Sequence, residues 1–302
     1  MITRRRALSI IASASFGVSA LPLIGTNAYA KATSWRGIAL GADAQIILDH
    51  ENSGELISLA LKEITRLEKI FSLYDKDSEI SILNAQGKLK NPAPEFVELL
   101  SIASTINHRT NGAFDPTIQP LWAAYAKSFS KGNAPSKEDI ARVKNIIGWQ
   151  GVNYSAEKIS FAKMGMSLTL NGIAQGYIAD RISNLFKRNG ITNVLINTGE
   201  IVALGHSPQE DSWQIKINNS DKSIALNNFA IATSAPLGTV FDQKNKISHI
   251  IDPRTGEPSL EVKQVSVIAK SATIADGLST GFCLMSEKEI NLAKRNEQII
   301  IS

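Results

Sequence analysis

Helix-like and strand-like patterns are mixed along this chain without the regular alternation of strand and helix that builds a parallel sheet. Helical patterns occur at 55–71 and 94–107, and the segment 171–177 leads into a third helix that runs to about Asn189. Strand-like runs cover 192–197, 213–218, 228–234 and 262–269. This order predicts an α+β fold with mixed, largely antiparallel sheets and packed helices. With 302 residues, 43% of them hydrophobic, the chain can bury one large core or two modest ones.

The amino terminus has the pattern of an export signal over residues 1–30. Three arginines, Arg4–Arg6, precede an apolar stretch at 10–24, and Ala28-Tyr29-Ala30 fits a small-x-small cleavage site. We therefore expect a single domain over 31–302 that is soluble in the periplasm after cleavage. The arginines also resemble a twin-arginine signal, although the Sec route stays open.

An uncleaved membrane anchor is the alternative for this leader. Fifteen residues at ~1.5 Å rise span roughly 22 Å, less than the ~30 Å hydrocarbon core, and Pro22 interrupts a spanning helix. Cys283 is the sole cysteine and lies far from the leader. The chain therefore has neither an intrachain disulfide nor an amino-terminal lipid anchor.

The charge balance argues against nucleic acid as a partner. Lysine and arginine number 32 against 28 acidic residues, and removing the three leader arginines leaves 29 against 28. A nearly neutral chain without a basic run lacks the electrostatic footprint of a nucleic-acid-binding protein.

The run from Ser248 to Pro258 places a histidine beside a rigid turn. Asp252-Pro253 favours a turn because proline presets φ, and Gly256 supplies a position with positive φ. Ile250 and Ile251 would anchor the end of a strand, which holds His249 at its edge. The alternative is an ordinary surface turn with an incidental histidine.

Asp276 and Thr280 form a second candidate site. Their spacing of four puts a carboxylate and a hydroxyl on one face of a helix, where both oxygens can reach one hard cation such as Mg²⁺. The alternative is a helix start in which Asp276 faces the positive end of the helix dipole and Thr280 packs.

Three further segments have a local interpretation. Segment 34–48, with Gly37 and Gly41, predicts a strand whose backbone lies close to another group, closest at 40–42. Segment 127–139 is rich in Ser, Lys, Gly, Asn and Pro and predicts a mobile insertion. Leu168–Leu170 is interpreted as the end of a strand that leads, through 171–177, into a helix that runs to about Asn189.

Seven short motifs occur in one order along the chain, and together they resemble the ApbE family. They are Leu40-Gly41-Ala42, Tyr74 with 78–81 and Asn84, 112–116, 171–177, Thr233-Ser234, 249–256 and 275–280. The resemblance covers roughly residues 34–297, and an ordered set is far more specific than any single motif. It implies the T-fold-like architecture of that family.

The resemblance implies an FAD:protein FMN transferase. Such an enzyme uses Mg²⁺ to cleave FAD, attaches FMN to a threonine or serine of a target flavoprotein and releases AMP. It implies that Asp276, Thr280 and the backbone carbonyl of Gly172 bind Mg²⁺. The FAD contacts that it implies are Leu40, Tyr74, Ala113, Phe114, Asp115, Thr169, Gln175 and Ile251. We assign His249 as the candidate base for the acceptor hydroxyl, because neutral imidazole can accept a proton near pH 7.

Several positions depart from the family pattern. Leu40-Gly41-Ala42 stands where Met-Gly-Thr is usual, Thr169 where aspartate is common, and Gln175 where lysine or glutamate is usual. Ser279 stands where some members have a second aspartate, and fewer carboxylates would weaken Mg²⁺ binding. The segment Asn197-Thr198-Gly199-Glu200 replaces a double-glycine turn. This variant pattern is similar to a branch associated with nitrous oxide reductase maturation, which implies an acceptor flavoprotein in or at the inner membrane.

Two other functions fit the same residues. Water in place of the acceptor hydroxyl would make the enzyme an FAD pyrophosphatase that yields FMN and AMP. Loss of the cation would leave a non-catalytic FAD-binding carrier.

Overall fold

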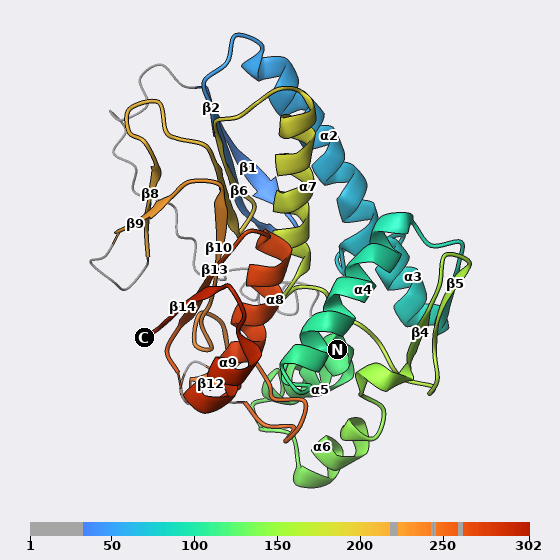
Figure 1. Cartoon of the computed structure of the whole chain (residues 1–302). Coiled ribbons are helices and arrows are strands. Elements are labelled where there is room, and N and C mark those ends of the chain that lie inside the picture. Colours follow the sequence, from blue (N-terminus) through green and yellow to red (C-terminus); the bar gives the residue numbers. More distant parts are fainter. Residues whose placement is uncertain (1–32, 218–222, 243, 245, 259–261) are drawn as a thin grey trace.

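A seven-stranded sheet forms the centre of the molecule (Figure 1). The structure is a computed structural model that describes residues 33–217, 223–242, 244, 246–258 and 262–302. Neighbouring strands are antiparallel throughout this sheet, which confirms the predicted α+β class with antiparallel pairing. In spatial order the strands are β1 (Thr33–Ala39), β2 (Ala42–Leu48), β6 (Val194–Asn197), β7 (Ile201–Leu204), β10 (Phe229–Ser234), β13 (Val265–Ala269) and β14 (Gln298–Ile301).

Helices cover one face of the sheet, and they enclose the main hydrophobic core. Helix α8 (Ala272–Phe282) packs on β10 and β13, and α7 (Ala174–Arg188) packs on α8, β6 and β7. Helices α2 (Ser53–Phe71) and α4 (Pro94–Arg109) flank this pair (Figure 1). The helices predicted at 55–71, at 94–107 and from the segment 171–177 to about Asn189 are therefore confirmed. Their apolar stripes are buried against the sheet and the neighbouring helices.

The other face of the sheet is covered by a hairpin of β8 (Trp213–Lys216) and β9 (Ser223–Leu226). Successive residues of a strand point to opposite faces, so Ile46 and Leu48 enter the main core while Ile47 enters a second cluster with Trp213. Burial on both faces explains why the strands have nearly continuous apolar sequences.

Segment 34–48 is a β-hairpin, and its prediction as one strand was wrong. Leu40 and Gly41 form a two-residue turn with φ of 47° and 79°, and Ala39 pairs with Ala42 across it. Positive φ at both turn residues matches the twist of a tight hairpin. A close approach occurs at Gly37, where an added Cβ would lie 2.2 Å from the Trp35 ring, whereas the closest approach was predicted at 40–42.

The segment after α2 contains a helix that the sequence did not indicate, α3 (Glu79–Gln86), which Ser78 caps by accepting a hydrogen bond from the Ser81 amide. One other local prediction needs correction. Leu168–Leu170 is not a strand end, because the Thr169 amide donates to Pro116 O instead of to a sheet neighbour. The predicted mobile segment 127–139 overlaps both the end of α5 (Gln119–Phe129) and the start of α6 (Lys137–Lys144).

Smaller elements complete the described chain. Strands β3 (Lys88–Lys90), β5 (Lys158–Phe161) and β4 (Val152–Tyr154) form a small sheet, and β11 (Val240–Asp242) pairs with β12 (Ile247–Ser248). A cluster around Leu121, Tyr125 and Phe241 joins α5 and β11. The last helix is α9 (Glu287–Ala293). None of the helices in the described ranges combines the length and apolar character needed to cross a membrane.

Candidate functional site

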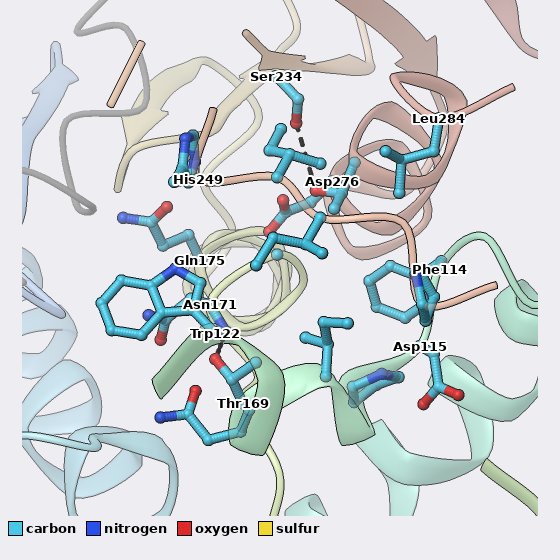
Figure 2. A pocket seen from close by; sticks show the side chains of 18 of the residues that line it. Phe114, Asp115, Trp122, Thr169, Asn171, Gln175, Ser234, His249, Asp276 and Leu284 are labelled. Carbon is cyan, nitrogen blue, oxygen red and sulfur yellow. Dashed lines mark hydrogen bonds between the residues drawn. The ribbon is translucent and has the colours of Figure 1, made fainter. Parts of the chain in front are cut away.

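A cavity of about 280 Å³ opens where β10, α7, α8, α5 and the loop after β12 meet. It brings together residues that are far apart in the sequence, and Figure 2 shows their side chains around it. Eleven of the twelve residues predicted for the site line this cavity: Tyr74, Ala113, Phe114, Asp115, Thr169, Gly172, Gln175, His249, Ile251, Asp276 and Thr280.

Leu40 is the one predicted site residue that is not among the described residues of the cavity lining. Its amide donates a 2.8 Å hydrogen bond to Glu68 Oε1 on α2, and its side chain packs against the main core. This bond fixes the hairpin turn to the helix layer. A contact of Leu40 with a ligand stays a prediction.

The carboxylate of Asp276 lies deep in the cavity and does not cap the helix that carries it. The amino terminus of α8 is capped instead by Ser271 and by Asp180 of α7, which accepts hydrogen bonds from the amides of Ala272 and Thr273. Asp276 Oδ2 accepts a 3.0 Å hydrogen bond from the Gly176 amide. The helix-start interpretation of Asp276 is therefore wrong, since other groups already satisfy the first turn.

The three residues predicted to bind a metal are brought together. Thr280 lies one turn beyond Asp276 on α8, and a Cβ added to Gly172 would lie 2.8 Å from Thr280 Oγ1. Ser234 Oγ on β10 lies 3.3 Å from Thr280 Oγ1 and 2.8 Å from Ser279 Oγ. A carboxylate, hydroxyls and nearby backbone therefore converge at one end of the cavity.

Glu200 is a second buried carboxylate in this cavity, and the sequence analysis did not assign it to the site. It lies in the turn between β6 and β7, is 8% exposed, and accepts a 3.2 Å hydrogen bond from the Thr233 amide through Oε2. The sequence signal was an acidic residue directly before the apolar strand Ile201–Leu204, which is an unusual position for a solvated side chain.

Burial dominates the electrostatics of both carboxylates. It raises the pKa of Asp276 to about 7, and the Gly176 hydrogen bond opposes that rise. Burial also raises the pKa of Glu200 well above its ordinary value, and the negative charge of Asp276 raises it further. Among the described residues, no lysine or arginine lines the cavity.

This donor set fits a hard divalent cation. The described residues hold no group of three or more His, Cys, Asp or Glu side chains of the kind that binds Zn²⁺. They do offer carboxylate, hydroxyl and carbonyl oxygens, which Mg²⁺ prefers, and Mg²⁺ keeps part of its shell for water or phosphate oxygens. Neither carboxylate has a lysine or arginine beside it in the described lining, so a cation here would stabilise their ionised forms.

His249 lies at the cavity wall directly after β12. Its Nδ1 is 2.9 Å from Thr239 O and 3.3 Å from Pro236 O. A carbonyl oxygen can only accept, so Nδ1 carries the proton and Nε2 of the neutral ring is the acceptor. Burial lowers the pKa of His249, an effect that the two carbonyls oppose, which favours the neutral ring at pH 7.

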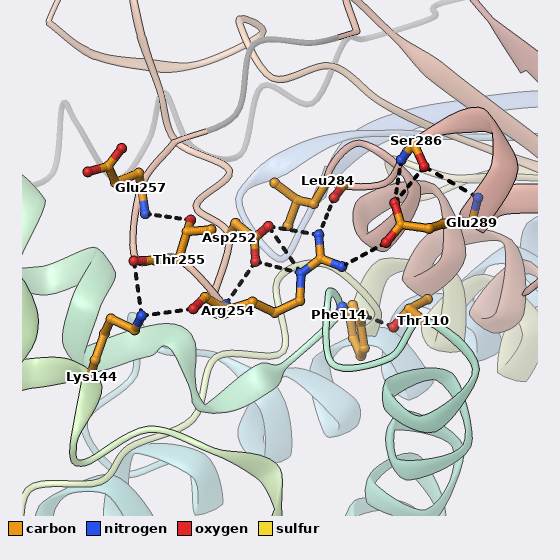
Figure 3. A network of polar contacts seen from close by, with 10 residues as sticks. All are labelled: Thr110, Phe114, Lys144, Asp252, Arg254, Thr255, Glu257, Leu284, Ser286 and Glu289. Carbon is orange, nitrogen blue, oxygen red and sulfur yellow. Dashed lines mark hydrogen bonds and ion pairs between the residues drawn. The ribbon is translucent and has the colours of Figure 1, made fainter.

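The loop after His249 is rigid, as the sequence predicts. The Gly256 amide donates to Asp252 O at 2.7 Å, and Gly256 has φ of 88°. The Arg254 guanidinium forms a bidentate pair with Asp252 and also donates to Leu284 O after α8 (Figure 3). Glu289 of α9 adds a longer ion pair to the same arginine. The loop that presents Ile251 is therefore tied to the carboxyl end of α8.

Aromatic side chains line other parts of the cavity. Tyr74, Phe114 and Trp122 contribute to the lining, and in the view of Figure 2 Trp122 and Phe114 lie on opposite sides of Asp276. Trp122 of α5 was not predicted. Planar rings of this kind suit a ligand with flat heterocycles.

Asp115 has a structural role in this region. Its two carboxylate oxygens accept hydrogen bonds from the Thr117 amide and hydroxyl and from the Trp149 amide, at 2.7–3.0 Å. Burial raises its pKa, and these hydrogen bonds oppose the rise. Whether Asp115 also contacts a ligand stays a prediction.

Comparison with known proteins places this geometry in a family context. The sequence model of the ApbE family matches residues 40–301. The chain is 29% identical over 276 residues to a Haemophilus influenzae protein named FAD:protein FMN transferase, covering 84% of this chain and 79% of that protein. A Vibrio cholerae protein of the same name is 30% identical over 233 residues, covering 72% and 69%. The crystal structure of Pseudomonas stutzeri flavinyl transferase ApbE in its apo form aligns with a TM-score of 0.79 at 27% identity, covering 90% of each chain.

Proposed function

The chain belongs to the ApbE family and is an FAD:protein FMN transferase, and we propose that the cavity described above is its active site. One observation carries this proposal: the cavity joins a histidine with an available Nε2 acceptor to two buried carboxylates, with no lysine or arginine among the described lining residues. The first group suits proton abstraction, and the second suits a cation that binds a pyrophosphate.

The aromatic and apolar walls would hold the two ring systems of FAD. The carboxylate end around Asp276 would hold Mg²⁺ and the pyrophosphate. Two buried carboxylates, with no lysine or arginine among the described lining residues, would otherwise disfavour phosphate binding. Asp276, Thr280 and the carbonyl of Gly172 would hold the ion. When bound, Mg²⁺ would neutralise charge that develops on the pyrophosphate oxygens.

His249 would act on the acceptor protein. Its Nε2 accepts the proton of a threonine or serine hydroxyl, and the hydroxyl oxygen forms a bond to the phosphorus of the FMN half of FAD. The bond between that phosphorus and the bridging oxygen breaks, and AMP leaves with the bridging oxygen. The Pro236 and Thr239 carbonyls keep the ring in the tautomer that this step needs.

Mass spectrometry separates the proposed reaction from its two alternatives. A candidate acceptor would be incubated with the enzyme, FAD and Mg²⁺, and both protein and nucleotide products would be measured. An FMN adduct on a threonine or serine, with one AMP released for each adduct, supports transfer. AMP without an adduct would indicate FAD hydrolysis, and unchanged FAD would indicate a carrier.

Export is part of the proposal. The leader at 1–30 lies outside the residues that the structure describes, and its sequence supports cleavage before Lys31 and transfer to the periplasm. A membrane flavoprotein facing that compartment is then the expected acceptor. The mature protein, isolated from a periplasmic fraction, is expected to begin at Lys31 when its amino terminus is sequenced. A full-length amino terminus retained in the membrane fraction would instead support an uncleaved anchor.

The raised pKa of Asp276 predicts how stability depends on pH. This pKa is about 7 in the folded chain and about 4 in an unfolded chain. Between these values the unfolded chain loses the proton while the folded chain keeps it, so the free energy of unfolding falls as the pH rises from about 4 to about 7. Bound Mg²⁺ should offset this loss, and most strongly above pH 7.

The measurement compares thermal unfolding of the wild-type protein and Asp276→Asn at several pH values, with and without Mg²⁺. His249, whose pKa is lowered, contributes to the pH dependence with the opposite sign, and the comparison cancels that contribution. Glu200, whose pKa is also raised, adds a decline of the same sign as that of Asp276. Asp276→Asn is therefore expected to show a smaller decline in stability with pH and to lose most of the stabilisation by Mg²⁺. An unchanged Mg²⁺ effect in this variant would contradict the assignment of Asp276.

A further inference from the structure

The turn between β6 and β7 holds the Glu200 side chain in the active-site cavity. The Gly199 amide donates to Asn197 Oδ1 at 3.0 Å, and Thr198 Oγ1 donates to Gln175 O at 3.0 Å. Gly199 has φ of 100°, and a Cβ there would lie 2.6 Å from the Gln175 side chain. The turn is therefore fixed in its own conformation and packed tightly against α7.

Within the described residues, the Glu200 side chain makes a single hydrogen bond, accepted by Oε2 from the Thr233 amide. The side chain is 8% exposed, lines the cavity, and has no described hydrogen-bond partner for Oε1. Burying a carboxylate with so little compensation is costly, and the charge of Asp276 in the same cavity adds repulsion.

A bound divalent cation would offset the cost of burying Glu200 and Asp276 in the same cavity. Asp276 is 3% exposed and also makes one described side-chain hydrogen bond, so neither buried carboxylate is fully paired within the described residues. They come from different elements, α8 and the β6–β7 turn, and they face one cavity without lysine or arginine in its described lining. Affinity for such an ion rises with the number of charged ligands.

We propose that Glu200 is a second anionic group of the cation site, which binds the divalent ion together with Asp276. This inference rests on the proposed function, because the ion is the one that the FMN transfer would use. It also accounts for the low carboxylate count at the predicted metal residues, since Glu200 supplies from another element the charge that Thr169 and Ser279 do not carry.

Glu200→Gln tests the proposal with two effects of opposite sign. The substitution keeps the size of the side chain and an oxygen that can accept from the Thr233 amide, but it removes the charge. The metal-free variant is expected to unfold at a higher temperature than the metal-free wild type at pH 8. Its affinity for Mn²⁺ alone, followed by the loss of the free-ion EPR signal, is expected to fall about 10- to 100-fold.

Glu79→Gln is the matched control. Glu79 is also a partly buried glutamate that accepts from one backbone amide, that of Ala93, and burial raises its pKa, but it lies outside the cavity. This control should bind Mn²⁺ with wild-type affinity. A purely structural role of Glu200 would lower the stability of Glu200→Gln without a selective loss of ion affinity.

The outcomes separate this inference from the proposed function. Wild-type Mn²⁺ affinity in Glu200→Gln, in a protein whose wild type binds Mn²⁺ and transfers FMN, would overturn the role of Glu200 and leave the proposed function intact. A wild-type protein that binds no Mn²⁺ and transfers no FMN would overturn both.

Discussion

A His249→Gln variant is expected to transfer FMN about 100- to 10,000-fold more slowly than the wild-type protein, with little change in FAD affinity. The substitution keeps a polar side chain of similar reach, but an amide cannot accept the proton of the acceptor hydroxyl. The measurement is the single-turnover rate of adduct formation, with FAD affinity determined separately by fluorescence titration.

The pH profile adds a second readout for His249. Because burial lowers its pKa from 6.5, the wild-type rate should be level near neutral pH and fall on the acidic side, where the ring is protonated. His249→Gln should lose that acidic decline. In addition, free imidazole should partly restore transfer to His249→Ala.

His206→Gln is the control for this experiment. His206 Nδ1 also lies 2.8 Å from a backbone carbonyl, that of Ser207, but the residue is exposed and does not line the cavity. This variant should keep the wild-type rate. If His249→Gln were as fast as His206→Gln at every pH, His249 would not be the base.

Gly176→Ala is expected to lower the free energy of unfolding by about 1–3 kcal/mol or more and to disturb the cation site. A Cβ at this position would lie 2.3 Å from Ala272 O and 2.8 Å from the Cβ of Asp276. Backbone atoms of α8 cannot rotate away as a flexible side chain can, so α7 and α8 must separate. Such a shift would weaken the hydrogen bond from the Gly176 amide to Asp276.

Urea unfolding, with the stabilisation by Mg²⁺ measured alongside, tests this prediction. Gly54→Ala is the control, because Gly54 also lies in a helix, at the start of α2, and an added Cβ would meet nothing within 4 Å. Alanine is the better helix former, so this variant should be neutral or slightly more stable. An unchanged urea midpoint in Gly176→Ala would show that the two helices can absorb the extra methyl group.

Periodic segments were predictable because local pattern and burial agree in them. The apolar stripe of α2 meets both α7 and β1, so its sequence carries a clear signal. Helix α3 was missed since it has only eight residues and its apolar side chains do not form a stripe. The hairpin turn at Leu40-Gly41 was missed because it lacks the Asn-Gly or Asp-Gly pair that is typical of such turns.

The chemistry of the site was easier to predict than its assembly. The sequence shows that Asp276 and Thr280 share a helix face, because that relation is local. It cannot show that Glu200 faces the same cavity, because β6 and β7 reach α8 only through the tertiary packing of the sheet. The structural role of Asp115 was equally hidden in the sequence. Its oxygens accept hydrogen bonds from Thr117 and from Trp149, and Trp149 is 34 residues away in the chain.

The main-chain carbonyls that hold His249 give the active site a form of mutational robustness. Histidine bases are often oriented by a carboxylate side chain, which a single codon change can remove. Here the acceptors are Pro236 O and Thr239 O, and a backbone oxygen persists whatever side chain occupies its position. The side chains at 236 and 239 can therefore change, in evolution or in a laboratory search for new target proteins, without removing the two carbonyl oxygens that keep the proton on Nδ1 of His249.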